Sequence, residues 1–198
     1  TVVVITRGDS AVGAIALSDT LRATSARAIQ ELTALGLTPI LASGDHDVVA
    51  QHVAKAVGVD RVFSAMTPEG KATLITELQS QGHTVAMVGD GINDAPGLAT
   101  ADVGIAMGSG SDAAMTAGDI TIVQGDILAV SDGIRLSRRT LRTIQANLFW
   151  AFAYNVAAIP LAMAGLLNPL LAGLAMALSS VFVVSNSLRL RRFRPTTQ

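Results

Sequence analysis

The sequence has 198 residues, of which 50% are hydrophobic and 15% are charged, with a formal net charge of −1 and no cysteine. The lack of cysteine excludes disulfides, thiol nucleophiles and thiolate metal ligands within this chain. Residues 1–132 hold all fifteen acids and six basic residues, a net charge of −9, whereas residues 133–198 hold eight arginines and no acid, a net charge of +8. This split predicts two physical environments, an acidic soluble domain and a basic part at a membrane surface.

Short β-branched or apolar runs alternate with amphipathic patterns in the first part of the chain. The predicted strands are 1–5, 14–17, 38–42, 61–63, 84–88, 103–106 and 120–123. The predicted helices are 25–35, 48–57 and 69–81, and Thr67 and Pro68 suit the N-cap and first position of the last helix. This alternation predicts an α/β fold, a doubly wound parallel sheet with helices on both faces. Ligands bind such sheets at the carboxyl ends of the strands.

Two uncharged stretches, 148–167 and 170–188, are each long enough to cross a bilayer as a helix. Asn168-Pro169 between them predicts a turn, and therefore an antiparallel transmembrane hairpin. Arginines flank the hairpin on both sides, in a connector at 133–147 and a tail at 189–198. The positive-inside rule then places the α/β domain and both ends of the hairpin in the cytoplasm. The alternative is a buried helical hairpin of a soluble protein. We interpret the C-terminal arginines as contacts to anionic lipid, with no nucleic acid as a partner.

A polar, glycine-rich motif, Gly-Asp-Gly-Ile-Asn-Asp-Ala-Pro, follows the predicted strand 84–88. Its carboxylates, Asp90 and Asp94, are four residues apart and can converge on one hard cation. Mg²⁺ prefers one or two carboxylates together with phosphate oxygens and water. The motif therefore predicts a magnesium and phosphate site, the alternative being a polar turn with a helix cap at Asp94.

Two further segments suit phosphate chemistry at the same edge of the sheet. Lys71 lies in the first turn of a predicted helix, where its charge can stabilise a phosphoryl group during transfer. Ser43, Gly44 and Asp45 follow strand 38–42 and offer a hydroxyl and free amides for phosphate oxygens. Taken singly, the lysine is also typical of a solvated surface and the Ser-Gly-Asp segment of a helix cap.

The order of these motifs along the chain resembles that in the haloacid dehalogenase superfamily, and their amino-acid sequences are similar to those of P-type ATPases. The similarity extends to Asn93 within the Gly-Asp motif, to the segment 101–112, and to Asp19 and Arg22. It implies an ATP-hydrolysing pump in which Mg²⁺ binds at Asp90 and Asp94, and in which Ser43, Gly44, Asp45, Lys71 and Asn93 are catalytic. The phosphorylated Asp-Lys-Thr-Gly-Thr motif of that family is not in this sequence. We therefore expect a C-terminal fragment, inactive alone, whose partners are the actuator domain, the nucleotide-binding domain and the first membrane helices.

Polar and thioether groups within the uncharged stretches resemble the signature of the copper(I) branch of these pumps. They are Tyr154, Asn155, Met176 and Ser180. A thioether suits Cu⁺, and neither stretch contains Asp, Glu, Lys or His, which argues against a zinc pump. Asn155 and Ser180 have an alternative role in holding helices together. The resemblance implies copper export across the plasma membrane.

Two other functions remain open. Asp45-His46-Asp47-Val48-Val49 superficially matches the Asp-x-Asp-x-Val nucleophile pattern of membrane-anchored phosphatases in the same superfamily. A truncated, non-catalytic product is the third possibility.

Overall fold

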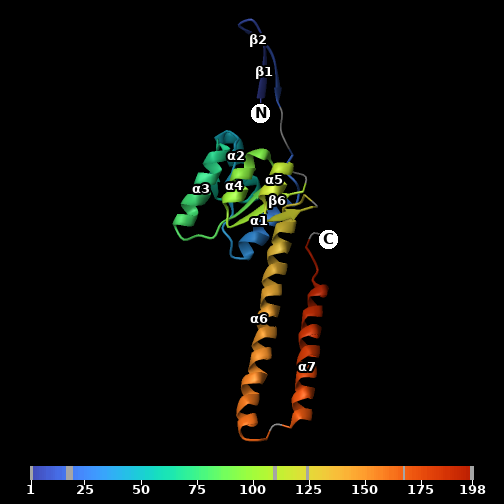
Figure 1. Cartoon of the computed structure of the whole chain (residues 1–198). Coiled ribbons are helices and arrows are strands. Elements are labelled where there is room, and N and C mark those ends of the chain that lie inside the picture. The colour runs from blue at the N-terminus through green and yellow to red at the C-terminus, as the bar shows by residue number, and fades with distance from the viewer. Residues whose placement is uncertain (1, 17–19, 109–110, 124, 167, 197–198) are drawn as a thin grey trace.

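The computed structural model describes residues 2–16, 20–108, 111–123, 125–166 and 168–196. Three parts follow one another along the chain: a strand hairpin, an α/β domain and a pair of long helices (Figure 1). The strand hairpin and the long helices extend from opposite sides of the α/β domain, and the C-terminal end of the chain returns toward that domain.

The N-terminal hairpin consists of β1 (Val2–Arg7) and β2 (Ser10–Ala16), which pair antiparallel. Gly8, at φ +60°, supplies the left-handed conformation that the tight turn needs. The prediction that this region begins the parallel sheet is wrong, because among the described residues β1 and β2 pair only with each other. The hairpin leaves large apolar side chains exposed: Val4, Ile5, Val12 and Ile15.

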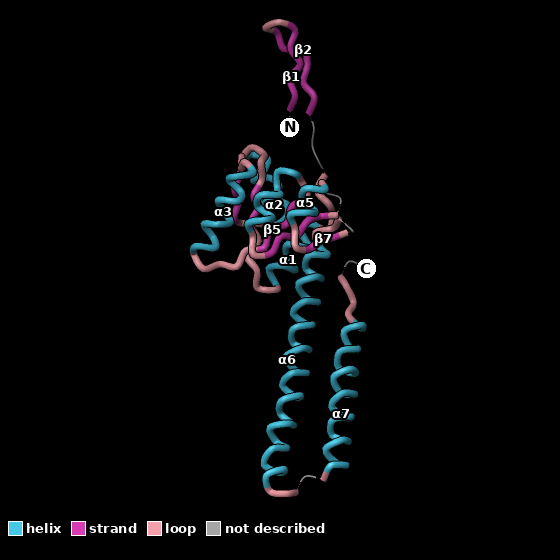
Figure 2. The backbone as a smooth tube through the Cα atoms, viewed as in Figure 1, coloured by secondary structure: helices cyan, strands magenta, loops and turns pink. Residues whose placement is uncertain are grey.

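The α/β domain contains parallel strands in two hydrogen-bonded groups, β3 with β4, and β5, β6 and β7 in that order (Figure 2). The strands are β3 (Ile40–Ala42), β4 (Arg61–Phe63), β5 (Ala86–Gly89), β6 (Val103–Met107) and β7 (Ile120–Ile122). The helices are α1 (Ser25–Ala34), α2 (Asp47–Val57), α3 (Pro68–Ser80), the 3₁₀ turn η1 (Ile92–Asp94), α4 (Ala95–Thr100) and α5 (Asp112–Ala117). The predicted α/β class with a parallel sheet is confirmed. Strand β3 begins two residues later than predicted, since Pro39 has no N–H to donate to a neighbouring strand.

Two clusters of small and apolar side chains form the core of this domain. One joins α2 to β4, and the other joins α4 and α5 to β6. The second cluster depends on close backbone approach, because a Cβ on Gly104 would lie 2.5 Å from the Leu98 carbonyl oxygen. Helix α4, which starts at the last two residues of the Gly-Asp motif, is thereby packed firmly onto the central strand of the three.

Helix α6 (Leu128–Met163) is a single helix of 36 residues that runs from the α/β domain to the far end of the molecule. The predicted connector at 133–147 and the predicted first span therefore belong to one element. The helix ends at Met163, earlier than the predicted residue 167, because Gly165 adopts φ +70° and closes it. Residue 167 lies outside the described residues.

Helix α7 (Pro169–Leu188) returns antiparallel to α6 and continues into the 3₁₀ turn η2 (Arg189–Arg192). Asn168 caps it, since the Asn168 side chain accepts a hydrogen bond from the Leu170 amide at 2.9 Å. Both long helices are long and apolar enough to cross a membrane, and their apolar windows are 0% buried. Core helices of soluble proteins are mostly buried, so the exposure of these windows among the described residues favours a membrane hairpin over a buried one.

Candidate functional site

The Gly-Asp motif forms a compact turn at the carboxyl end of β5. One carboxylate oxygen of Asp94 accepts hydrogen bonds from the amides of Asp90 at 3.3 Å and Gly91 at 3.2 Å. The Asp94 carboxylate thus turns back toward the end of β5, where the two amides lie. Gly89 makes this possible, because a Cβ at that position would lie 2.6 Å from the Asp94 Cβ.

Lys71 completes this turn from a neighbouring element. Its Nζ donates to the second carboxylate oxygen of Asp94 at 2.6 Å, and the two side chains are only 14% and 13% exposed. Thr67 caps α3 as predicted, accepting from the Gly70 amide at 3.0 Å, so the lysine sits in a well-anchored first turn. The structure therefore brings Lys71 and Asp94 together as an ion pair.

Asp90 is exposed, and its main chain is hydrogen-bonded to the end of the segment 101–112, which the sequence also singled out. The Asp90 carbonyl accepts from the Ser111 amide at 2.9 Å, and Ser111 in turn caps α5 through a bond from the Ala114 amide at 3.2 Å. Residues 109 and 110 of that motif lie outside the described residues. Asp94 is already bonded through both oxygens, so Asp90 is the carboxylate of the pair that faces solvent.

The Ser-Gly-Asp segment after β3 is a second, separately organised turn. The Ser43 hydroxyl donates to the Asp45 carboxylate at 2.9 Å and accepts from the Asp45 amide at 3.1 Å. The Ser43 carbonyl accepts from the Met66 amide at 3.0 Å, directly before the cap of α3. Among the described residues no hydrogen bond joins this segment to Asp90 or Asp94, and the hydrogen bonds of both turns lead to the start of α3.

The remaining sequence-based predictions concern Asn93, the pair Asp19 and Arg22, and the Asp-x-Asp pattern. Asn93 is exposed within η1. Arg22 is exposed before α1, and Asp19 lies outside the described residues. Asp47 is the first residue of α2 and accepts from the Ser64 hydroxyl at 3.0 Å. The Asp-x-Asp pattern thus spans a loop and a helix start, with each carboxylate bonded to a serine, so nothing in this geometry favours Asp45 as a nucleophile.

The described residues contain no cluster of three or more His, Cys, Asp or Glu side chains that could hold a metal ion. The site therefore offers two carboxylates, one of which is paired with a lysine. Mg²⁺ commonly binds through one or two carboxylates and completes its shell with phosphate oxygens and water. The donor set at the Gly-Asp turn fits a cation that arrives together with a phosphate group.

The predicted copper ligands lie on the two long helices and make contacts within their own helix. Asn155 donates to the Ala151 carbonyl at 2.6 Å, and Ser180 donates to the Met176 carbonyl at 3.2 Å. The Met176 side chain is 63% exposed, and Tyr154 is half-buried. The structure does not join these four side chains by hydrogen bonds.

The direct contacts between α6 and α7 lie nearer the α/β domain, and they were missed in the sequence. Asn186 donates to the Asn147 side-chain oxygen at 2.7 Å, while Asn147 donates to the Ser187 hydroxyl at 3.1 Å. Trp150 and Phe182 meet edge to face with ring centroids 6.4 Å apart. Polar side chains in apolar helices are costly unless they are bonded, and this is the signal that could have found Asn147 and Asn186.

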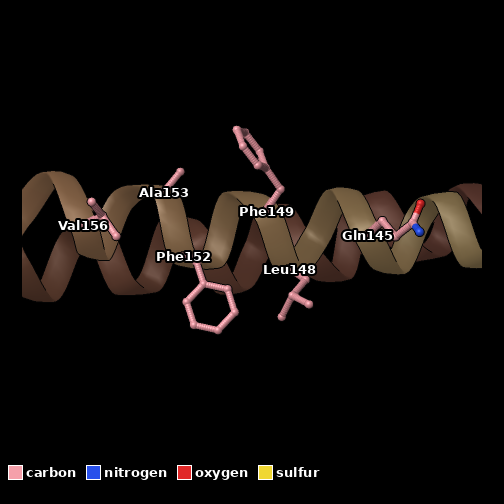
Figure 3. Close-up of a pocket in the computed structure, with 6 residues that line it drawn as sticks. All are labelled: Gln145, Leu148, Phe149, Phe152, Ala153 and Val156. Carbon is pink, nitrogen blue, oxygen red and sulfur yellow. The ribbon is translucent and has the colours of Figure 1, made fainter.

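Beyond these contacts the second half of α6, from Leu148 to Met163, leaves most of its large apolar side chains uncovered. An open hollow along the helix is lined by Gln145, Leu148, Phe149, Phe152, Ala153 and Val156 (Figure 3). Phe149 and Phe152 project in different directions from the helix, so apolar groups cover more than one of its sides. Such a surface is typical of a helix surrounded by lipid or by other helices.

A parallel α/β domain with a carboxylate turn at a strand end, paired with a lysine from the helix that precedes this strand, fits a hydrolase with a parallel α/β fold. Residues 1–102 match the haloacid dehalogenase-like hydrolase family, and the chain belongs to it.

Individual relatives are more specific. The chain is 54% identical over 182 residues to a copper-exporting P-type ATPase of Staphylococcus haemolyticus, an alignment that covers 92% of this chain and 23% of the relative. It is 53% identical over 193 residues to the cation-transporting P-type ATPase B of Mycobacterium leprae, covering 98% and 26%. The chain thus spans about a quarter of the length of the curated relatives it matches.

Solved structures agree with this relationship. A zinc-transporting PIB-type ATPase in its E2.Pi state superposes with a TM-score of 0.85 at 38% identity, covering 96% of this chain and 31% of that one. The catalytic domain of a CPx-ATPase superposes with a TM-score of 0.58 at 32% identity, covering 65% and 51%.

Proposed function

We propose that this chain is the C-terminal part of an ATP-driven copper(I) export pump of the P-type class. The observation that carries the proposal is the Lys71–Asp94 pair beside the exposed Asp90, in a chain that continues directly into two apolar helices. A phosphoryl-transfer site joined to a membrane hairpin is the arrangement that an ion pump requires. The similarity to copper-exporting relatives supports the proposal.

In this proposal the turn after β5 serves phosphoryl transfer. Asp90, with Asp94 beside it, holds Mg²⁺ together with phosphate oxygens and water, and the cation neutralises charge on the transferred group. Lys71 fixes Asp94 and adds positive charge to the site. Ser43, Gly44 and Asp45 contribute a hydroxyl and amides toward phosphate, and Asn93 is exposed on the same turn as Asp90. The carboxylate that receives the phosphoryl group of ATP belongs to the remainder of the pump.

Tyr154, Asn155, Met176 and Ser180 are proposed to contribute ligands to transported Cu⁺. Asn147 lies opposite Asn186, and Trp150 opposite Phe182. Extending this antiparallel register brings Asn155 to a level between Met176 and Ser180, so all four residues lie at one depth of the hairpin. The solved relative transports zinc, but the uncharged stretches 148–167 and 170–188 of the long helices here lack the carboxylates that a harder ion favours and offer a thioether instead.

The placement in the membrane follows from charge. Arginines lie on α6 before its apolar part and again after α7, so both ends of the hairpin are assigned to the cytoplasmic side of the plasma membrane. The partners of the chain are then the lipid bilayer and the actuator, nucleotide-binding and first membrane segments of the pump.

The test is phosphorylation of the complete protein with labelled ATP and Mg²⁺, followed by acid gel electrophoresis. A copper(I)-dependent, acid-stable and hydroxylamine-sensitive label is expected on the complete protein, and none on this 198-residue polypeptide. Label on the isolated polypeptide would favour Asp45 as the nucleophile and a phosphatase, instead of a pump, as the function. If Zn²⁺ stimulates phosphorylation and Cu⁺ does not, the transported ion is zinc and the proposal of copper is wrong.

A further inference from the structure

Asp132, in the second turn of α6, is a buried carboxylate that the proposed chemistry does not use. It is 6% exposed and lies beside the buried Leu128, Val130 and Ser131. A buried carboxylate is costly unless hydrogen bonds and a countercharge compensate for the lost water. Its partners therefore indicate what holds this part of the molecule together.

The partners come from the far end of the chain. The Thr196 amide donates to the two carboxylate oxygens of Asp132 at 2.9 and 2.8 Å, and the Thr196 hydroxyl donates to the first of them at 2.9 Å. Sixty-four positions separate the two residues in the sequence. The C-terminal strap, residues 193–196, thus leaves η2 and crosses back to the start of α6.

Arg135 closes the contact from three sides. Its guanidinium lies 3.3 Å from the Asp132 carboxylate, donates to the Thr196 hydroxyl, and stacks 5.8 Å from the centre of the Phe193 ring. The same guanidinium lies 3.6 Å from Glu31 on α1. One arginine therefore joins the α/β domain, α6 and the strap.

This arrangement has a mechanical result. Without the strap, the hydrogen bonds that α7 makes to the rest of the described chain would be those to α6. With the strap, the end of α7 is bonded to the first turns of α6, which pack against α1, where Arg138 also donates to the Leu35 carbonyl at 2.6 Å. The helical hairpin is thereby closed into a loop at its domain end.

We propose that Asp132 is a positioning residue that, through Thr196, fastens the end of α7 to the α/β domain, so that both long helices move with the domain during turnover. The strap itself stands on the contacts above, whereas its role in turnover rests on the proposed pump function. Asp132 binds a segment 64 positions away rather than groups of its own helix alone, which is what a positioning role requires.

The test uses the complete protein and the variant Thr196→Pro, which removes both the amide donor and the hydroxyl. Thr196→Ser, which keeps both donors, is the matched control. Hydrogen exchange of the peptide spanning residues 189–196 is expected to become about tenfold faster in Thr196→Pro and to stay unchanged in Thr196→Ser. Unchanged exchange in Thr196→Pro would overturn the strap. Asp132→Asn, which removes the charge at nearly constant size, is expected to reproduce the faster exchange.

The second measurement is the number of copper ions transported per ATP hydrolysed. In Thr196→Pro this ratio is expected to fall by about threefold or more, with phosphoenzyme levels from ATP unchanged and the ratio retained in Thr196→Ser. An unchanged ratio together with lost protection would overturn the positioning role. If the unmodified protein forms no copper-dependent phosphoenzyme, the positioning role falls together with the proposed function, and the exchange experiment still decides the strap.

Discussion

Lys71 and Asp94 form a 2.6 Å ion pair between the first turn of α3 and the end of η1, and the second oxygen of Asp94 receives the amides of Asp90 and Gly91. Asp94 is therefore the structural centre of the turn, while Asp90 is held by its main chain with its carboxylate exposed. The two acids of the motif differ in what their removal should do.

Asp94→Ala is expected to loosen the turn. It leaves the Lys71 ammonium and two amides without their acceptor, which should lower the free energy of local opening around β5 by about 1–3 kcal/mol. Hydrogen exchange at the amides of residues 90 and 91 measures this. Asp60→Ala, at an exposed position between α2 and β4, serves as the control and should stay within about 0.5 kcal/mol. Equal protection in both variants would contradict the central role of Asp94.

Asp90→Asn is expected to leave the turn folded but to abolish phosphorylation of the complete protein by ATP. The reason is that a cation held by few carboxylates neutralises phosphate charge poorly once one carboxylate is neutral. Labelling with ATP measures the effect, with Asp112→Asn on the exposed first turn of α5 as the matched control. Wild-type labelling of Asp90→Asn would remove Asp90 from the site.

The parts of the fold that depend on local chemistry could be predicted from the sequence. Thr67 and Pro68 gave the start of α3, Asn168 and Pro169 gave the start of α7, and the apolar run before Gly89 gave the strand that carries the carboxylate turn. Each of these signals acts within a few residues, where capping and turn geometry are strongest.

The features that the sequence did not predict depend on contacts between distant residues, or on the fact that a helix can continue unchanged from a charged into an apolar segment. The change from charged to apolar residues near 148 suggested a boundary in α6, but backbone hydrogen bonds continue through it without interruption. The bond between Asp132 and Thr196 joins residues that no local pattern relates. The sequence predicted that Lys71 and Asp94 lie at the same edge of the sheet but not that they form an ion pair. The roles of Asn93 and of the Ser43 turn stay predictions.

Asp102 is expected to give the domain a pH-dependent stability at the acid end. The Val85 amide, which donates at 2.7 Å, and then the Gln79 side chain lower the pKa of Asp102 below its ordinary value of 3.8. A carboxyl whose pKa is lower in the folded state stabilises fully above its unfolded pKa and loses that contribution as the pH falls through the folded pKa.

The thermal midpoint of Asp102→Asn should therefore lie below that of the wild type near neutral pH, and the gap should narrow as the pH falls below 3.8. Asp9→Asn, in the exposed turn of the N-terminal hairpin, should follow the wild-type curve throughout. A gap that stays constant down to the most acidic conditions would show that the Asp102 carboxylate does not contribute through its charge.

Met176→Leu is expected to separate copper binding from folding in the complete protein. The exchange keeps volume and hydrophobicity but removes the sulfur, so the helix should be retained. Copper-stimulated ATP hydrolysis should be lost, while phosphorylation by inorganic phosphate in the reverse direction should persist. Met163→Leu, also exposed and on the last turn of α6, is the control. Full copper stimulation in Met176→Leu would reduce Met176 to a packing residue.

The unbroken course of α6 makes it a lever. Its 36 residues, at about 1.5 Å each, give a rod of about 54 Å that begins beside α1 and has no joint where it leaves the α/β domain. Asn155 lies about 40 Å along this rod, so a tilt of about 5° at the domain displaces it by about 3.5 Å. That distance exceeds the length of a metal–ligand bond. In the proposed pump, a rotation of this size at the domain is therefore large enough, at the proposed copper ligands of the same helix, to make or break the coordination of an ion.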